Sequence, residues 1–150
     1  MTRIAAPVAT VLLIAIGAIE ASVSAQQLSA LRTPPRLEEV SVTLTAAGFL
    51  ASAVIYLVLG RLAADERAAL RVGAATGILA GLVGGSMRAL IISESVGGLV
   101  NRYAAVPDFF VPVALAVFVL LSGAASALGG GTLAWTGRRL SRAARSRPPA

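Results

Sequence analysis

Four apolar stretches, each about as long as a membrane is thick, constrain this chain more than any other feature. They run from about residue 5 to 25, 40 to 60, 72 to 92 and 109 to 134. A helix rises 1.5 Å per residue, so about 20 mainly apolar residues cross the hydrocarbon core of a bilayer. Lipid offers the backbone no hydrogen-bond partner, and the alternating short strands of a barrel are absent from the sequence. The predicted fold is therefore an all-α integral membrane protein, a four-helix transmembrane bundle.

The composition favours lipid over water as the surrounding medium. The 150 residues are 57% hydrophobic and 13% charged, whereas soluble domains carry about 25% charged residues. A soluble domain of this size keeps much of its area exposed and has too little interior for so much apolar surface. We expect residues 1–137 to form a single bundle and residues 138–150 to form a disordered basic tail on the cytoplasmic side.

The N-terminus also permits a different interpretation, a secretory signal peptide. Arg3 supplies a short basic region, an apolar run follows, and Val23-Ser24-Ala25 offers a small-residue cleavage site. The single basic residue and the charge of Glu20 close to the cut count against it. Cleavage of residues 1–25 would leave three helices, and the direction of those helices would stay the same.

Arginine placement predicts the orientation in the cell membrane. All 13 basic residues are arginines, and positive charge in short flanks is retained on the cytoplasmic side. One side of the predicted bundle collects nine of them, namely Arg3, Arg61, Arg67, Arg71, Arg138, Arg139, Arg142, Arg145 and Arg147. The other side collects three, namely Arg32, Arg36 and Arg102. A multi-pass protein with both termini in the cytoplasm is therefore predicted.

Two connections between the stretches have a distinct composition. Arg61 and Asp65 are four residues apart, the spacing of an ion pair on a helical extension of the second stretch. Residues 93–108 contain Gly97-Gly98, Asn101 and Pro107 and are predicted to form a loop.

Small residues predict how the third and fourth stretches pack. The third repeats glycine every four residues, with one more glycine beside the repeat: Gly73, Gly77, Gly81 and Gly85, with Gly84. The fourth carries a matching stripe, Ser122, Ser126 and Gly130. Residues four apart share a helix face, and small side chains let two membrane helices approach closely. We therefore expect the two helices to pack antiparallel within one molecule. Packing between protomers is the alternative.

Two ionisable residues, Glu20 and Arg88, lie within the apolar stretches. Glu20 is about 24 Å along its helix from Ile4, and Arg88 is about 26 Å from Arg71, so both charges fall at nearly the same depth. An unpaired charge in the hydrocarbon core costs about 2.5 to 3.5 kcal/mol on insertion scales. The interpretations are interfacial placement of each residue, a structural ion pair, or a role in transport.

The arginines of the C-terminal tail predict contact with anionic lipid headgroups. They are Arg138, Arg139, Arg142, Arg145 and Arg147. Each arginine near a membrane surface contributes about 1 kcal/mol of attraction to anionic lipid. No aromatic platform accompanies the cluster, so nucleic acid is not an expected partner.

The sequence offers almost nothing for catalysis or metal binding. It has no histidine and no cysteine, which excludes thiolate catalysis and metal sites built on imidazole or sulfur. We therefore expect no enzyme, no metal site and no cofactor. The expected function is that of an assembly or accessory subunit that packs against copies of itself or other membrane proteins. A small oligomeric channel or transporter that uses Glu20 and Arg88 is the alternative.

Overall fold

The computed structural model describes residues 2–29, 39–103, 107 and 109–145. In this part of the chain all regular structure is helical, with α1 (Thr2–Ser29), α2 (Glu39–Leu62), α3 (Glu66–Tyr103) and α4 (Phe110–Arg145). Each contains a segment long and apolar enough to cross a membrane: Ile4–Val23, Thr43–Leu62, Glu66–Ser93 and Phe110–Ala144. The described residues thus confirm the predicted all-α, four-helix bundle.

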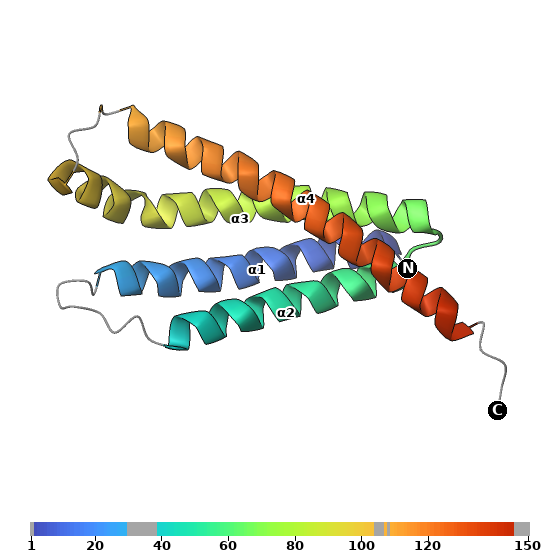
Figure 1. Ribbon diagram of the computed structural model, residues 1–150. Helices are drawn as coiled ribbons and strands as arrows, with labels where there is room; N and C mark the ends of the chain where they lie inside the picture. The colour runs from blue at the N-terminus through green and yellow to red at the C-terminus, as the bar shows by residue number, and fades with distance from the viewer. Residues whose placement is uncertain (1, 30–38, 104–106, 108, 146–150) are drawn as a thin grey trace.

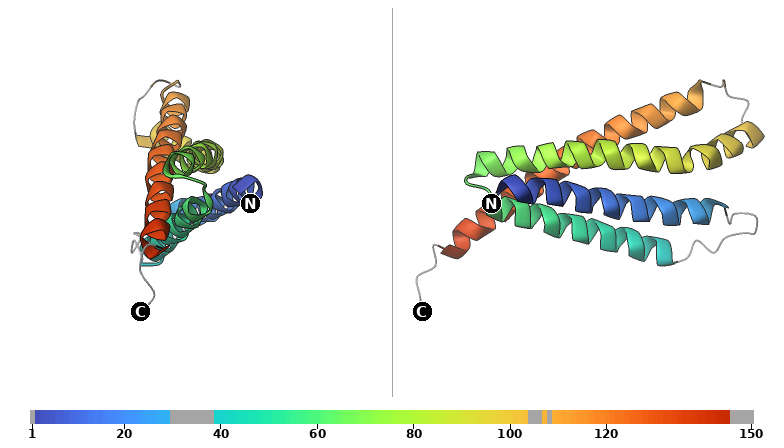
Figure 2. Two further views of the ribbon diagram at one scale, coloured as in Figure 1. Left: turned by 90° about the vertical axis from the view of Figure 1, so that its right-hand side faces the viewer. Right: turned by 180° about the vertical axis from the view of Figure 1, so that it is seen from behind.

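Each helix runs antiparallel to the one before it in the chain (Figure 1). The start of α1, the end of α2, the start of α3 and the end of α4 lie together at one end, which we call the basic end; the opposite end is the far end. Both α1 and α4 pack against α2 and α3, and the largest interface joins α3 to α4. Figure 2 shows that α4 crosses the bundle obliquely, so its first half lies beside α3 and its last part passes α2.

Most buried apolar side chains are small, and many large ones face outward. The buried apolar residues are Ala9, Leu13, Ala21, Tyr56, Leu59, Ala63, Ala69, Ala89 and Ala134. By contrast, Leu90 and Leu128 are each 73% exposed. Exposed leucines are unfavourable in water but neutral in lipid, whose tails are equally apolar. This arrangement is the one expected of helices that are solvated by acyl chains.

The α3 helix is longer than the third apolar stretch. It continues without a break to Tyr103, so the loop predicted for residues 93–108 is wrong as far as Tyr103. Glycine costs a helix about 1 kcal/mol relative to alanine but leaves its hydrogen bonds intact, so Gly97-Gly98 does not end it. Pro107, which lacks the amide hydrogen, comes only after the helix has ended.

The α4 helix also continues beyond its apolar stretch, to Arg145. The predicted disordered tail is therefore wrong for residues 138–145, while residues 146–150 lie outside the described part. Arginine, alanine and leucine, which dominate this segment, are all good helix formers. At the other terminus Pro112 lies in the first turn, where its missing amide hydrogen costs nothing.

The connection between α2 and α3 is a tight turn rather than a helical extension. Because α2 ends at Leu62, the four-residue spacing of Arg61 and Asp65 does not place them on one helix. Instead, a carboxylate oxygen of Asp65 accepts a hydrogen bond of 2.7 Å from the amide of Ala68. Asp65 therefore caps the N-terminus of α3, where the first amides have no partner within the helix.

The α1 helix belongs to the bundle in the full-length chain. It runs unbroken from Thr2 to Ser29, through the cleavage site that the sequence offers at Ala25. Ala9, Leu13 and Ala21 are buried against its neighbours.

Candidate functional site

The glycine repeat of α3 meets the small stripe of α4 within one molecule. A methyl group at Gly77 would collide with the carbonyl oxygen of Ser126, and one at Gly81 would lie 2.6 Å from that of Ser122. Gly73 faces the carbonyl oxygen of Gly130 in the same way. The two backbones therefore touch directly, as the interpretation of antiparallel packing within one molecule requires. Because α4 covers this face of α3, the face is not open to a second molecule.

Gly84 and Gly85 differ from the rest of the repeat. A methyl group at Gly85 would lie 3.2 Å from Cβ of Ser122, a tight but not prohibitive contact. At Gly84 the same group would meet nothing within 4 Å. Gly84 was expected to contribute to helix packing, and that expectation is wrong: its helix position, three residues after Gly81, turns it out of the contact.

Two further glycines bring α2 against α4. A methyl group at Gly60 would collide with the carbonyl oxygen of Ala134, and one at Gly137 would collide with that of Leu57. The sequence does not predict these contacts, because each glycine stands alone, outside any four-residue repeat. The oblique path of α4 makes them contacts, and that path is not visible in a single sequence.

The structure brings Glu20 and Arg88 together. Nη2 of Arg88 donates to Oε2 of Glu20 at 2.7 Å, a charge-assisted bond between α1 and α3. The side chains are 18% and 36% exposed, respectively. Gly48 of α2 makes room for the pair, because a methyl group there would collide with the Glu20 carboxylate. The two charges therefore neutralise each other where α1, α2 and α3 meet.

A cleft with a volume of about 410 Å³ lies among α1, α2, α3 and α4. Its walls are mainly apolar, with Phe49 from α2 and Phe118 from α4. Polar side chains also line it: Ser52, Tyr56, Ser122, Ser126 and Arg88. Three glycines that line it have open space where a side chain would stand: Gly17, Gly84 and Gly129. Glycine thus serves two purposes here, close packing at some positions and open space at others.

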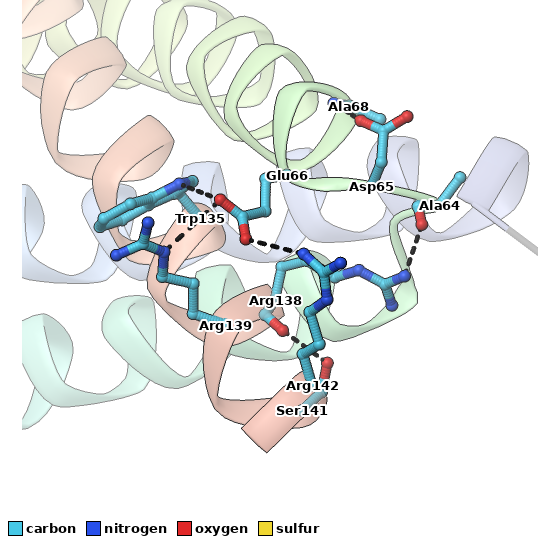
Figure 3. A network of polar contacts seen from close by, with 9 residues as sticks. All are labelled: Ala64, Asp65, Glu66, Ala68, Trp135, Arg138, Arg139, Ser141 and Arg142. Carbon is cyan, nitrogen blue, oxygen red and sulfur yellow. Dashed lines mark hydrogen bonds and ion pairs between the residues drawn. The ribbon is translucent and has the colours of Figure 1, made fainter. Parts of the chain in front are cut away.

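A polar network at the basic end ties α4 to α3 (Figure 3). Glu66, the first residue of α3, accepts a hydrogen bond of 3.1 Å from the indole of Trp135. Nε of Arg139 and Nη1 of Arg142 each lie 3.4 Å from its carboxylate. The guanidinium of Arg139 also lies 4.0 Å from the centre of the Trp135 ring. A carboxylate is favourable here as well because the N-terminus of a helix is partly positive.

The tail arginines are therefore only partly available to lipid. Arg138 donates to the backbone carbonyl of Ala64, and Arg139 and Arg142 share Glu66. Arg139 and Arg142 nevertheless keep side chains that are 59% and 78% exposed. The side chain of Arg145, and Arg147 as a whole, lie outside the described residues.

Chemistry-bearing side chains do not gather elsewhere in the described part of the chain. Within it, no group of three or more aspartate, glutamate, histidine or cysteine residues is placed to hold a metal ion. Comparisons with protein family models, with curated proteins and with solved structures found no match to this chain.

Proposed function

We propose that this protein is a multi-pass protein of the cell membrane that works without catalysis, as an assembly or accessory subunit. Its helices pack against a membrane partner, and its basic helical end lies at the cytoplasmic surface among anionic headgroups. The observation that carries the proposal is the exposure of α4. In the most apolar 18 residues of its span Phe110–Ala144, 6% of the residues are buried, against 17 to 33% in the corresponding stretches of the other three helices.

The first half of α4 offers the surface for a partner. Only α2 and α3 contact this helix within the described residues, and α2 meets its last part. Val113, Val117 and Leu120 fall on one side of the helix and are 49 to 66% exposed. In a membrane such a face packs against either acyl chains or another helix, and close packing between helices is what holds membrane complexes together.

The arrangement of charges supports an assembly role over transport. Glu20 and Arg88 satisfy each other at 2.7 Å, so neither is left as an isolated charge that needs a substrate ion. Glu66 is engaged by three side chains of α4. The other charged side chains whose exposure the structure describes, on residues 61–71 and 138–142, lie at the basic end, where the positive-inside rule predicts the cytoplasm.

Affinity purification after crosslinking in the native membrane tests the assembly proposal. Wild type is expected to retain a defined membrane protein in fixed ratio. Replacement of Val113, Val117 and Leu120 by alanine is expected to reduce that recovery at least tenfold. The matched control replaces Ile4, Val8 and Val11 of α1, which have the same spacing and are 52 to 75% exposed. Equal recovery from both triple variants, or no partner for wild type, would contradict the proposal.

Cysteine labelling tests the orientation, since the chain has no cysteine of its own. A membrane-impermeant maleimide applied to intact cells is expected to label Ala30→Cys. It is expected to leave Thr2→Cys and Ser146→Cys unlabelled until the membrane is opened. The reverse pattern would place the termini outside.

Transport remains a second candidate because the cleft contains Arg88. A channel or transporter would use the Glu20 and Arg88 pair as a gate or coupling site. Proton or cation flux into proteoliposomes that vanishes in Glu20→Gln would establish transport. Flux no greater than that of empty liposomes would contradict transport and favour the assembly role.

A further inference from the structure

The cleft combines the size of a ligand site with space that helix packing leaves unused. Its volume of about 410 Å³ falls within the range of about 300 to 1,000 Å³ for small-molecule sites. At Gly17, Gly84 and Gly129 a methyl group would meet no atom within 4 Å. These three glycines are therefore not needed for contact between helices, and they widen the cleft.

One end of the cleft carries a guanidinium group with donors to spare. The α3 residues that line the cleft run from Ala80 to Arg88, and Arg88 is nearest the far end because α3 points that way. Arg88 gives one hydrogen bond to Glu20, whereas a guanidinium has five N–H donors. The N–H donors that remain form a planar fork, and this fork matches the spacing of the oxygens of a phosphate.

The depth of Arg88 matches that of a lipid headgroup. Arg88 lies about 26 Å along α3 from Arg71 at the helical rise, while the hydrocarbon core is about 30 Å thick. If Arg71 marks the cytoplasmic boundary, Arg88 reaches the boundary of the opposite leaflet. Phe49 and Phe118 also line the cleft, and Ser122, which faces Gly81 and Gly85, lies one to two helical turns deeper in its wall.

We propose that this cleft binds one phospholipid molecule of the outer leaflet, with the phosphate on Arg88 and an acyl chain along the apolar walls. The remaining N–H donors of the guanidinium and its depth favour a phospholipid, whose phosphate oxygens can accept them, over a lipid without a phosphate. The Ser122 hydroxyl is placed to donate to an ester carbonyl of the same molecule. This inference depends on insertion into a bilayer in the orientation proposed above, but it does not depend on a partner subunit.

Native mass spectrometry of the delipidated full-length protein in mild detergent tests the proposal. Phosphatidylglycerol is expected to add in a ratio of one to one. Glycerol 3-phosphate, which has the phosphate without chains, and diacylglycerol, which has chains without phosphate, are each expected to bind at least tenfold more weakly. Equal binding of diacylglycerol would show that the phosphate plays no part and would overturn the proposal.

Filling the cleft provides a test that spares the helix contacts. Gly84→Leu is expected to weaken phosphatidylglycerol binding at least tenfold, because the new side chain occupies the open space. Val83→Leu, next to it on α3 but outside the cleft, is the matched control and is expected to bind as wild type does. Gly129→Leu fills the same cleft from α4, nearer the basic end, and is expected to repeat the effect if Gly84→Leu does not elute as a folded monomer. Unchanged binding in the folded cleft variant would contradict the site.

The two members of the ion pair give a second, independent test. Arg88→Gln is expected to weaken phosphatidylglycerol binding about tenfold. Glu20→Gln is expected to strengthen it severalfold, since the carboxylate no longer neutralises the guanidinium. Both substitutions break the same ion pair, so a purely structural effect would move binding in the same direction. The same direction in both variants would overturn the role of Arg88.

Discussion

Two glycines of one helix, Gly77 and Gly84, have opposite surroundings. At Gly77 a methyl group would collide with the backbone of α4, and at Gly84 it would meet nothing within 4 Å. Seven residues separate them, about 10 Å along the helix axis, and at the depth of Gly84 it is its neighbour Gly85 that faces α4. The same residue type therefore permits backbone contact at one position and leaves the cleft open at the other.

Alanine substitutions at these glycines are expected to differ in their effect on stability. Gly77→Ala should lower the free energy of unfolding by about 2 kcal/mol, in the range for overpacking a filled interior. Gly84→Ala should leave it unchanged or raise it slightly, because alanine favours the helix. Unfolding of the purified proteins in mixed micelles by titration with sodium dodecyl sulfate measures both. Equal stability of the two variants would contradict the backbone contact between α3 and α4.

The Glu20 and Arg88 pair should be visible as an energetic coupling. Hydrogen bonds to charged groups contribute about 1.5 to 3 kcal/mol, and the partial exposure of both side chains places this one at the low end. Glu20→Gln and Arg88→Gln are each expected to destabilise the bundle, and the double variant is expected to cost less than their sum. The double-mutant cycle uses the same unfolding titration. Additive effects would mean that the pair contributes nothing to the fold.

At the scale of the element, α4 unites a membrane span and a polar end in one rigid helix. Its 36 residues correspond to about 54 Å, well beyond the hydrocarbon thickness of about 30 Å. Exposed ion pairs are individually weak, typically below about 1 kcal/mol. The indole hydrogen bond of Trp135 and the Arg139 stacking add to the contacts of Glu66. Together they fix the end of α4 on the start of α3.

Removing the carboxylate of Glu66 is expected to loosen the end of α4. In Glu66→Gln the amides of residues 138–145 should exchange with deuterium about tenfold faster, because Arg139 and Arg142 lose their shared partner. The amides of the buried part of α4 should keep their protection. Arg67→Gln, the next residue of α3, is the control and is expected to exchange as wild type does. Unchanged protection in Glu66→Gln would show that helix propensity alone maintains this segment.

At the scale of the whole molecule, the sequence predicts the bundle because lipid leaves the backbone so few alternatives. It also predicts the α3–α4 face, since a four-residue glycine repeat needs only helical geometry to define one side. Other features depend on how the helices cross. They are the cleft, the contacts of Gly60 and Gly137, and the room that Gly48 leaves for Glu20. Crossing angles arise from the joint packing of all the side chains, and isolated glycines carry no periodic signal. The sequence does not predict the full lengths of α3 and α4, because the glycines inside α3 and the polar end of α4 resemble loops in composition.

Every feature described here depends on acyl chains covering the outward side chains, among them Leu90 and Leu128 at 73% exposure. Washing native membranes with alkaline carbonate tests that dependence most directly, because it opens vesicles and releases proteins that are not embedded. The full-length protein is expected to stay in the membrane pellet and to enter solution only with detergent. Release into the carbonate supernatant as a folded monomer would contradict a bundle solvated by lipid.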